Sequence, residues 1–125
     1  MLVSRLFLIL VILMLAGFGI GSLLNPGWLA GLVEFEMGTT TARSDIRAFY
    51  GGIEPAPAVF LIWCLLDPSR VRFALGFTGL VFGFVAAPRG LGMLPDRPVT
   101  SVTVTAFAVE AAPAVIALVL AGRMS

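Results

Sequence analysis

The sequence predicts an all-α integral membrane protein, a four-helix bundle forming a single transmembrane domain over residues 1–125. Hydrophobic residues make up 59% of the 125 positions, charged residues only 12%, and the mean hydropathy is +1.06. A soluble domain is about 45–50% apolar and about 25% charged. Four apolar segments are also long enough to cross a bilayer. Helices are the expected state there, because they satisfy their backbone hydrogen bonds without water.

The first predicted helix runs from about residue 6 to residue 24 and contains no charged side chain. A hydrocarbon core of ~30 Å needs about 20 helical residues, so the segment can span. Arg5, the apolar run and Ala16-Gly17 also resemble a secretory signal peptide, which would be removed from the mature protein. The run is longer than a usual signal core, so a retained helix is the preferred interpretation.

A short interfacial helix is predicted over residues 26–33. Asn25-Pro26 is a good helix start, and Trp28, Leu29 and Leu32 form an apolar stripe after it. Such a segment lies at the membrane surface. Anchoring is the preferred role, and a lid over a pocket is the alternative.

The second and fourth predicted helices, about residues 46–66 and 99–121, each hold a glutamate within an apolar segment. Glu54 opens the phrase Glu-Pro-Ala-Pro-Ala-Val, and Glu110 opens Glu-Ala-Ala-Pro-Ala-Val. A carboxylate at bilayer depth costs about 2.5–3.5 kcal/mol, so both are candidates for a ligand site or a buried polar network. The prolines free helical carbonyls near each glutamate, and together these groups predict a hydratable pocket at mid-membrane.

The third predicted helix, about residues 71–87, contains Gly79-x-x-x-Gly83, and the first contains Gly17-x-x-x-Gly21. Glycines at this spacing allow helices to pack closely. Each motif is followed five residues later by a proline. With the repeated glutamate phrase, this order indicates two tandem helix-hairpin repeats in parallel orientation. Chance similarity in a Gly/Ala/Pro-rich chain is the alternative.

Polar residues follow one face of the second helix. Arg43, Arg47, Tyr50 and Glu54 are spaced by four, three and four positions, which places them on the same side of a helix. Arg47, Tyr50, Glu54 and Glu110 are therefore the candidate ligand-binding residues, and Arg43 is a more peripheral candidate. A polar network that only orients the helices is the alternative.

The same stretch resembles a known family signature. Ala42-Arg-Ser-Asp-Ile-Arg-Ala-Phe-Tyr-Gly-Gly52 is similar to the signature of the bacterial membrane family called domain of unknown function 4345. The likeness extends to the chain length, the four helices and a Glu in the last helix. It implies a four-helix fold in the bacterial cytoplasmic membrane and no established activity. Pro55 and Pro57 depart from the more Gly/Leu-rich family pattern.

Several functions are excluded by the residue types. The chain has no His and no Lys, and its single cysteine is Cys64. Zinc centres, internal disulfides, Schiff-base chemistry and a Walker lysine are therefore ruled out. We predict no metal and no cofactor. The net charge of +1 gives no indication of nucleic-acid binding.

The number of arginines is equal on the two sides of the membrane, so the count alone gives no orientation. The short loop holding Arg70 and Arg72 is the densest basic cluster. Because basic loops stay cytoplasmic, both termini are predicted to be cytoplasmic.

The predicted function is a small binding or transport module whose mid-membrane pocket takes a small lipid-like ligand. Three alternatives are an accessory subunit of a larger membrane complex, an enzyme acting on a lipid or quinone, and a homodimeric proton-coupled carrier. An enzyme would lack any nucleophile, His or metal set beyond the glutamates, and a carrier would lack a continuous polar path. The expected partners are the lipid bilayer, the ligand, and a second copy or a larger complex.

Overall fold

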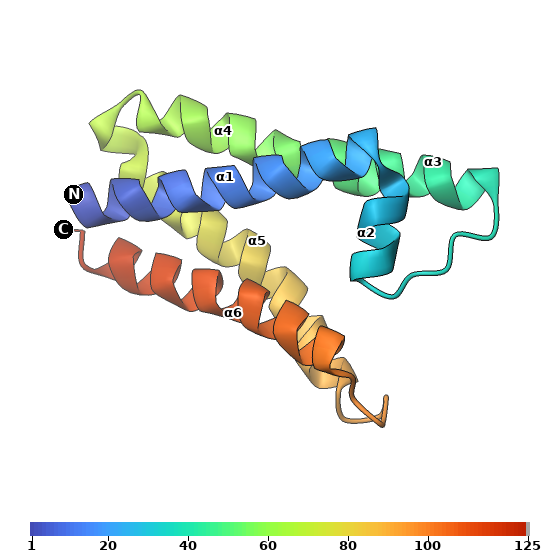
Figure 1. Cartoon of the computed structure of the whole chain (residues 1–125). Coiled ribbons are helices and arrows are strands. Elements are labelled where there is room, and N and C mark those ends of the chain that lie inside the picture. The colour runs from blue at the N-terminus through green and yellow to red at the C-terminus, as the bar shows by residue number, and fades with distance from the viewer. Residues whose placement is uncertain (125) are drawn as a thin grey trace. The chain divides into compact units, whose positions relative to one another are not determined.

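The computed structural model describes residues 1–124, and every regular element in that range is a helix (Figure 1). The all-α prediction is confirmed. In chain order the elements are α1 (Leu2–Leu24), α2 (Pro26–Leu32), α3 (Thr40–Ala48), the π-helix η1 (Phe49–Ile53), α4 (Pro55–Leu65), the 3₁₀ helix η2 (Pro68–Arg70), α5 (Val71–Gly92) and α6 (Ser101–Gly122).

Four helical stretches are long and apolar enough to cross a membrane. They are Leu2–Leu24, Thr40–Leu65, Pro68–Gly92 and Ser101–Gly122. Their lengths lie between 22 and 26 residues, which suits a hydrocarbon core of ~30 Å. The chain is therefore a multi-pass membrane protein.

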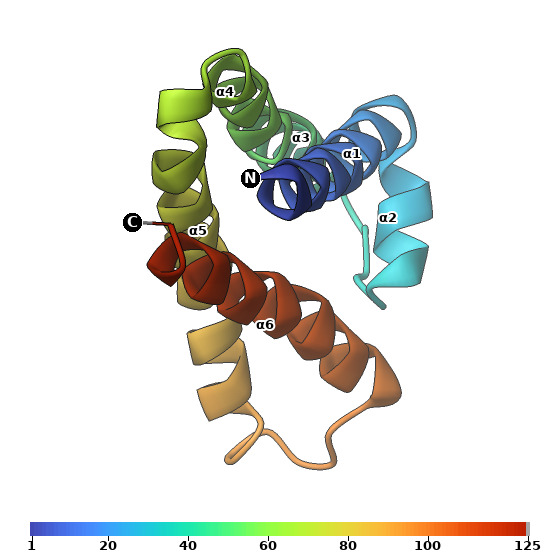
Figure 2. The same ribbon diagram turned by 90° about the vertical axis from the view of Figure 1, so that its left-hand side faces the viewer.

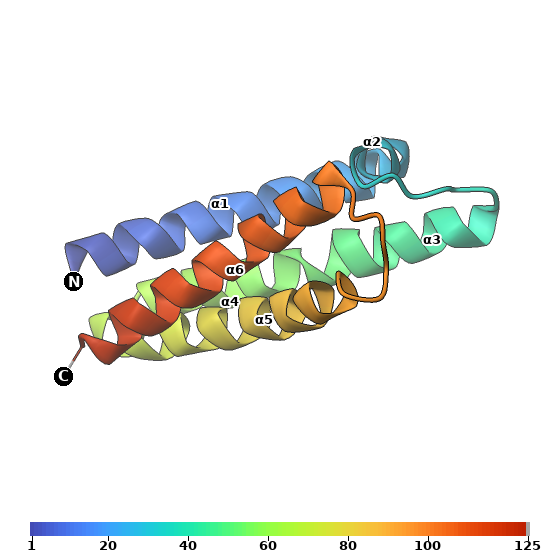
Figure 3. The same ribbon diagram turned by 90° about the horizontal axis from the view of Figure 1, so that it is seen from below.

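The chain divides into two compact units. One comprises Leu6–Leu66, and the other comprises the chain from Asp67 onward together with Met1–Arg5. In the first unit, α1 packs against the rod formed by α3, η1 and α4, and α2 turns away at the end of α1 (Figure 1, Figure 2). In the second, α5 and α6 form an antiparallel hairpin (Figure 3).

The short helix α2 begins where the sequence predicts it. The Asn25 side chain accepts a hydrogen bond from the backbone N–H of Trp28 at 3.2 Å, and Pro26 occupies the first turn. Leu29 and Ala30 are buried in a cluster with Ile46 of α3. The Trp28 ring lies 6.0 Å from the Phe18 ring of α1. These contacts attach α2 to its own unit.

The second spanning segment differs from the single helix predicted for residues 46–66. It starts earlier, at Thr40, because the Thr39 hydroxyl accepts a hydrogen bond from the N–H of Ala42 at 3.1 Å. It is also interrupted by η1 before α4 begins at Pro55. Pro55 and Pro57 have no backbone N–H group to donate. They lie in the first turn of α4, where an N–H group would have no acceptor within that helix. The prolines therefore fall where η1 changes to α4 within the helical stretch Thr40–Leu65.

The third helix extends further than predicted. The prediction ends it at residue 87, whereas α5 continues through Pro88 to Gly92. A proline inside a helix loses one hydrogen bond, so packing must hold the last turn. That packing comes from Gly90, where an added Cβ would lie 2.8 Å from the Phe107 ring of α6. Arg89 consequently lies within the spanning helix and not in a loop.

Contacts at two glycines fix the register of α5 against α6. An added Cβ at Gly79 would lie 2.6 Å from Leu118, and one at Gly90 would meet Phe107. The two glycines are eleven residues apart on α5, and their contacts are eleven residues apart on α6. This equal spacing is expected of two straight antiparallel helices that touch at two points about three turns apart along their axes.

Candidate intramembrane polar site

The hairpin of α5 and α6 contains an ion pair within its membrane-spanning helices. Arg89 Nε donates to Glu110 Oε2 at 2.6 Å, and Arg89 Nη2 donates to Glu110 Oε1 at 2.7 Å. Both carboxylate oxygens are thus bound by one guanidinium. This fork geometry is the strong form of the arginine–carboxylate interaction, because two parallel charge-assisted hydrogen bonds fix the orientation as well as the charge.

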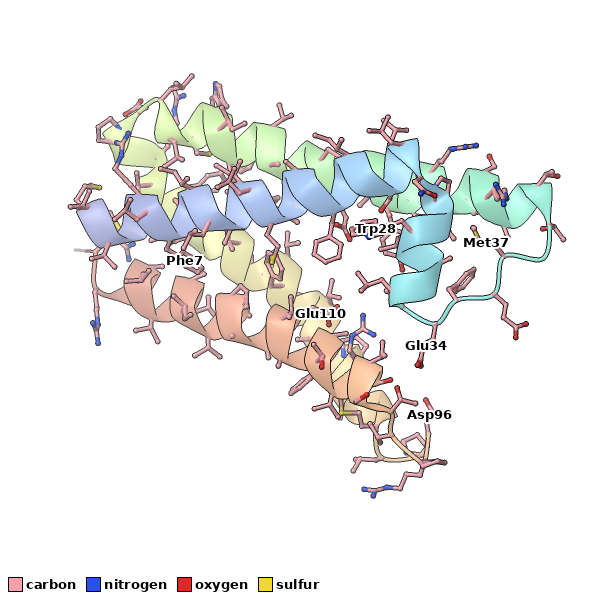
Figure 4. The ribbon with its side chains drawn as sticks, in the orientation of Figure 1. Phe7, Trp28, Glu34, Met37, Asp96 and Glu110 are labelled. Carbon is pink, nitrogen blue, oxygen red and sulfur yellow. The ribbon has the colours of Figure 1, made fainter. Side chains whose placement is uncertain are left out.

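The directions of the two helices explain how the side chains meet. Glu110 is the tenth residue of α6, near the middle of that helix, whereas Arg89 is three residues from the end of α5. Side chains on a helix tilt toward its N-terminus. In this antiparallel pair, Arg89 therefore leans deeper along α5 while Glu110 leans toward the loop, and the two close the gap. Figure 4 marks Glu110 on α6.

The two charges differ in their access to the surroundings. The Glu110 side chain is 16% exposed and the Arg89 side chain 37% exposed. The carboxylate is therefore the enclosed partner, and the guanidinium is the one that reaches outward. A charge at the centre of a membrane helix costs about 2.5–3.5 kcal/mol, so Glu110, near the middle of α6, is not expected there without a cation beside it.

A groove adjoins the exposed side of Arg89. It has a volume of about 600 Å³ and lies where α5 ends and α6 begins. Asp96, Thr100 and Thr103 contribute polar groups to its lining, while Val85, Pro88 and Met93 contribute apolar ones. A groove with apolar walls, a few polar groups and one guanidinium suits a small amphiphilic molecule.

The second predicted glutamate lies in the other unit, at the junction of η1 and α4. Glu54 is half-buried and directly precedes Pro55. The helix α1 approaches this junction very closely: an added Cβ at Gly51 would lie 3.1 Å from Leu23 Cα, and one at Gly19 would collide with the Pro55 ring. π-helical turns are rare and frequently occur at functional sites, so this junction is the candidate site of the first unit.

The remaining predicted site residues of this segment lie on its surface. Arg43, Arg47 and Tyr50 are exposed, and Tyr50 is the second residue of η1. The π-helix carries more residues per turn than an α-helix. The expected single α-helical face from Arg43 to Glu54 is therefore replaced by α3 followed by a wider turn. Glu54 and Glu110 belong to different units, so their convergence on one pocket stays a prediction.

The predicted packing glycines fall into two groups. Gly21 and Gly79 are close to neighbours, since an added Cβ would lie 2.7 Å from Trp28 at the first and 2.6 Å from Leu118 at the second. Gly17 and Gly83 have nothing within 4 Å of an added Cβ. The Gly-x-x-x-Gly pattern thus located one contact glycine in each helix. It did not indicate Gly19, which faces Pro55.

Arg89 is the site residue that the sequence interpretation missed. The prediction ended the third helix at about residue 87 and counted Arg89 outside the membrane. One signal was available: Glu110 lies deep in an apolar helix, and a buried carboxylate requires a nearby cation or hydrogen-bond donors. That signal calls for a cation beside Glu110 but does not single out Arg89, because Arg97 and Arg123 are both closer to Glu110 along the chain.

The helices and the ion pair define a small, multi-pass helical membrane protein with an ion pair between two of its membrane-spanning helices. A profile of the family described as "Domain of unknown function (DUF4345)" matches residues 3–121. The chain therefore belongs to this family, and the predicted family resemblance is confirmed. The comparisons with curated proteins and with solved structures found no match.

Proposed function

We propose that the protein is a small binding or transport module of the bacterial cytoplasmic membrane. Its ligand is a small lipid-like molecule with a polar head, held at a polar pocket within the membrane. The single observation that carries this proposal is the Arg89–Glu110 pair beside a groove of about 600 Å³. Intramembrane charges face cavities or one another, and they commonly mark ligand or ion pathways.

The geometry suggests how such a ligand would be recognised. Arg89 is the more exposed partner and lines the groove, while Glu110 holds the guanidinium from the other side. Thr100 and Thr103 place hydroxyl groups in the same groove. A polar head with acceptor oxygens would contact Arg89 and these hydroxyls, and its apolar body would lie against Val85 and Met93. Glu110 would keep the guanidinium oriented in the absence of ligand.

Glu54, Arg47 and Tyr50 of the first unit remain proposed ligand-binding residues of that unit. Two tandem helix-hairpin repeats are part of the proposal. They are supported by the repeated glutamate phrase and by the division into one unit holding Glu54 and another holding Glu110. Both termini lie in the cytoplasm under this proposal, on the side of the loop that contains Arg70 and Arg72.

The proposal is tested by identifying the small molecules that co-purify with the protein. Wild type and the double variant Arg89→Met/Glu110→Leu are extracted in mild detergent, and their bound molecules are compared by mass spectrometry. Removing both charges together avoids an unpaired buried charge. We expect a species that wild type retains and the double variant loses. Arg97→Gln, which changes an exposed arginine in the α5–α6 loop, is the matched control. Identical bound molecules in all three proteins would overturn the proposal.

A second candidate function is an accessory subunit of a larger membrane complex. The observation that favours it is that both oxygens of Glu110 are already bound by Arg89 of the same chain. A pair whose hydrogen bonds are made within the chain needs no ligand, and its role in this alternative is to hold α5 to α6. In that case the double variant would still co-purify with the same larger assembly, as detected by native gel electrophoresis of solubilised membranes, and no bound small molecule would depend on the pair.

A further inference from the structure

A second groove lies at the opposite end of the α5–α6 hairpin. It has a volume of about 720 Å³ and is lined by the first turns of α5 and the last turn of α6. Its walls along α5 are Phe73, Gly76, Phe77 and Leu80, with Arg72 at its mouth. The groove is separate from the Arg89–Glu110 site and is not used in the proposed function.

The lining residues of α5 form a continuous stripe. Positions 72, 73, 76, 77 and 80 follow the three- and four-residue spacing of one helix face. From Arg72 to Leu80 the stripe extends about 12 Å along the axis. Half of a ~30 Å hydrocarbon core is about 15 Å. The stripe therefore matches one leaflet, with a cation at headgroup depth and apolar walls beneath it.

The groove has free space that the protein itself does not fill. An added Cβ at Gly76 or at Gly122 meets no atom within 4 Å. Phe73 is 63% exposed and Leu80 is 59% exposed. A flexible acyl chain can lie between these side chains, since the two glycines leave the floor open on both helices.

Arg72 is the charged residue that lines this groove. Arg72 is exposed and forms no ion pair within residues 1–124. The one acidic group nearby, Asp67, is already engaged: it lies 3.4 Å from Arg70 and accepts hydrogen bonds from the Ser69 hydroxyl at 2.7 Å and the Ser69 N–H at 2.9 Å. Arg123 follows the last turn of α6. Complementarity therefore favours an anionic headgroup.

We propose that this groove binds one anionic phospholipid, with the phosphate on Arg72 and an acyl chain along Phe73, Gly76, Phe77 and Leu80. A basic site between helices beneath a membrane surface is a known arrangement for anionic lipids. Zwitterionic phospholipids share the acyl chains but bring a cationic headgroup toward Arg72. The chemistry at the mouth therefore selects against them.

The test is native mass spectrometry of the purified protein titrated with dioleoyl phosphatidylglycerol or dioleoyl phosphatidylcholine, which share the same acyl chains. We expect wild type to bind one phosphatidylglycerol about fivefold more tightly than phosphatidylcholine, the factor expected for one arginine near a membrane surface. Arg72→Gln should abolish this preference. Arg97→Gln, at the other end of the hairpin, should keep it.

A filling variant tests the groove itself. Gly76→Leu should weaken the first binding event for both lipids, and Gly122→Leu provides the same test from α6 if the first variant does not fold. The matched control is Gly83→Leu, because Gly83 also lies on α5 with nothing near an added Cβ but does not line the groove. The proposal is overturned if wild type binds the two lipids equally. It is also overturned if Arg72→Gln keeps the preference, or if a folded filling variant binds like wild type.

Discussion

Arg89 of α5 binds both carboxylate oxygens of Glu110 of α6, at 2.6 Å through Nε and at 2.7 Å through Nη2. This pair resolves the question that the isolated glutamate raises in the sequence, because a carboxylate within a spanning helix now has a cation of its own. It also links the two helices at a level where Gly90 admits the Phe107 ring. Packing and charge pairing thus coincide at one turn.

Arg89→Lys tests whether the geometry of the pair matters beyond its charge. Lysine keeps the positive charge but cannot donate two parallel hydrogen bonds to one carboxylate. We expect a loss of about 1.5 kcal/mol in the free energy of unfolding, the order of one hydrogen bond to a charged group. The free energy of unfolding is measured by SDS-induced unfolding in mixed micelles. Arg97→Lys is the control, and equal stability of Arg89→Lys and wild type would show that charge alone suffices.

Gly79→Ala tests the packing of α5 on α6. An added Cβ lies 2.6 Å from Leu118 Cδ2, and overpacking of this kind costs about 1–3 kcal/mol. We expect Gly79→Ala to be destabilising and the double variant Gly79→Ala/Leu118→Ala to regain part of the loss, because Leu118 is the side chain in the way. Gly83→Ala has free space and should be neutral or slightly stabilising. Equal effects at positions 79 and 83 would contradict the register.

Gly19→Ala tests the approach of α1 to the η1–α4 junction. An added Cβ at Gly19 would collide with the Pro55 ring, which cannot rotate away, whereas one at Gly17 meets nothing within 4 Å. Thermal denaturation in detergent should therefore show a clear fall in melting temperature for Gly19→Ala and little change for Gly17→Ala. The reverse order would favour the Gly17-x-x-x-Gly21 face as the contact surface and would reject the observed packing.

The turn between α4 and α5 contains a carboxyl whose titration is predictable. The Ser69 hydroxyl, and then the Ser69 N–H, donate to Asp67 and lower the pKa of that carboxyl below its ordinary value. The stabilisation is therefore complete above the ordinary aspartate pKa and is lost as the pH falls through the lower folded pKa. Ser69→Ala should raise the pKa of Asp67 toward its ordinary value in a carboxyl ¹³C NMR titration. An unchanged pKa would rule out the hydroxyl as the main cause.

The sequence was sufficient for the class of fold because bilayer thickness and hydropathy act on long segments. The four spans follow from the hydropathy and length of the segments. The helix start at Asn25-Pro26 was also predicted, and in the structure the Asn25 side chain caps α2 by accepting a hydrogen bond from the N–H of Trp28. The predicted family is also confirmed by the profile match over residues 3–121. These features depend on neighbours in the chain, which a sequence displays directly.

The site was less predictable because it depends on contacts between helices. The predicted third helix stopped at residue 87 and left out Arg89, whereas α5 continues through Pro88 and packs against Phe107 of α6 at Gly90. The π-helix η1 lies where α1 approaches Gly51 and Pro55, and the sequence analysis did not predict it. Glu110 was identified from its depth in an apolar helix, but its partner was not.

A double-mutant cycle on Arg89 and Glu110, measured as SDS-induced unfolding, decides whether this pair is the polar centre of the hairpin. Arg89→Met and Glu110→Leu alone each leave an unpaired intramembrane charge and should destabilise the protein by about 3 kcal/mol, whereas the double variant removes both charges and should be closer to wild type. The predicted coupling is above about 1 kcal/mol. Additive losses, with the double variant the least stable of the four proteins, would contradict it.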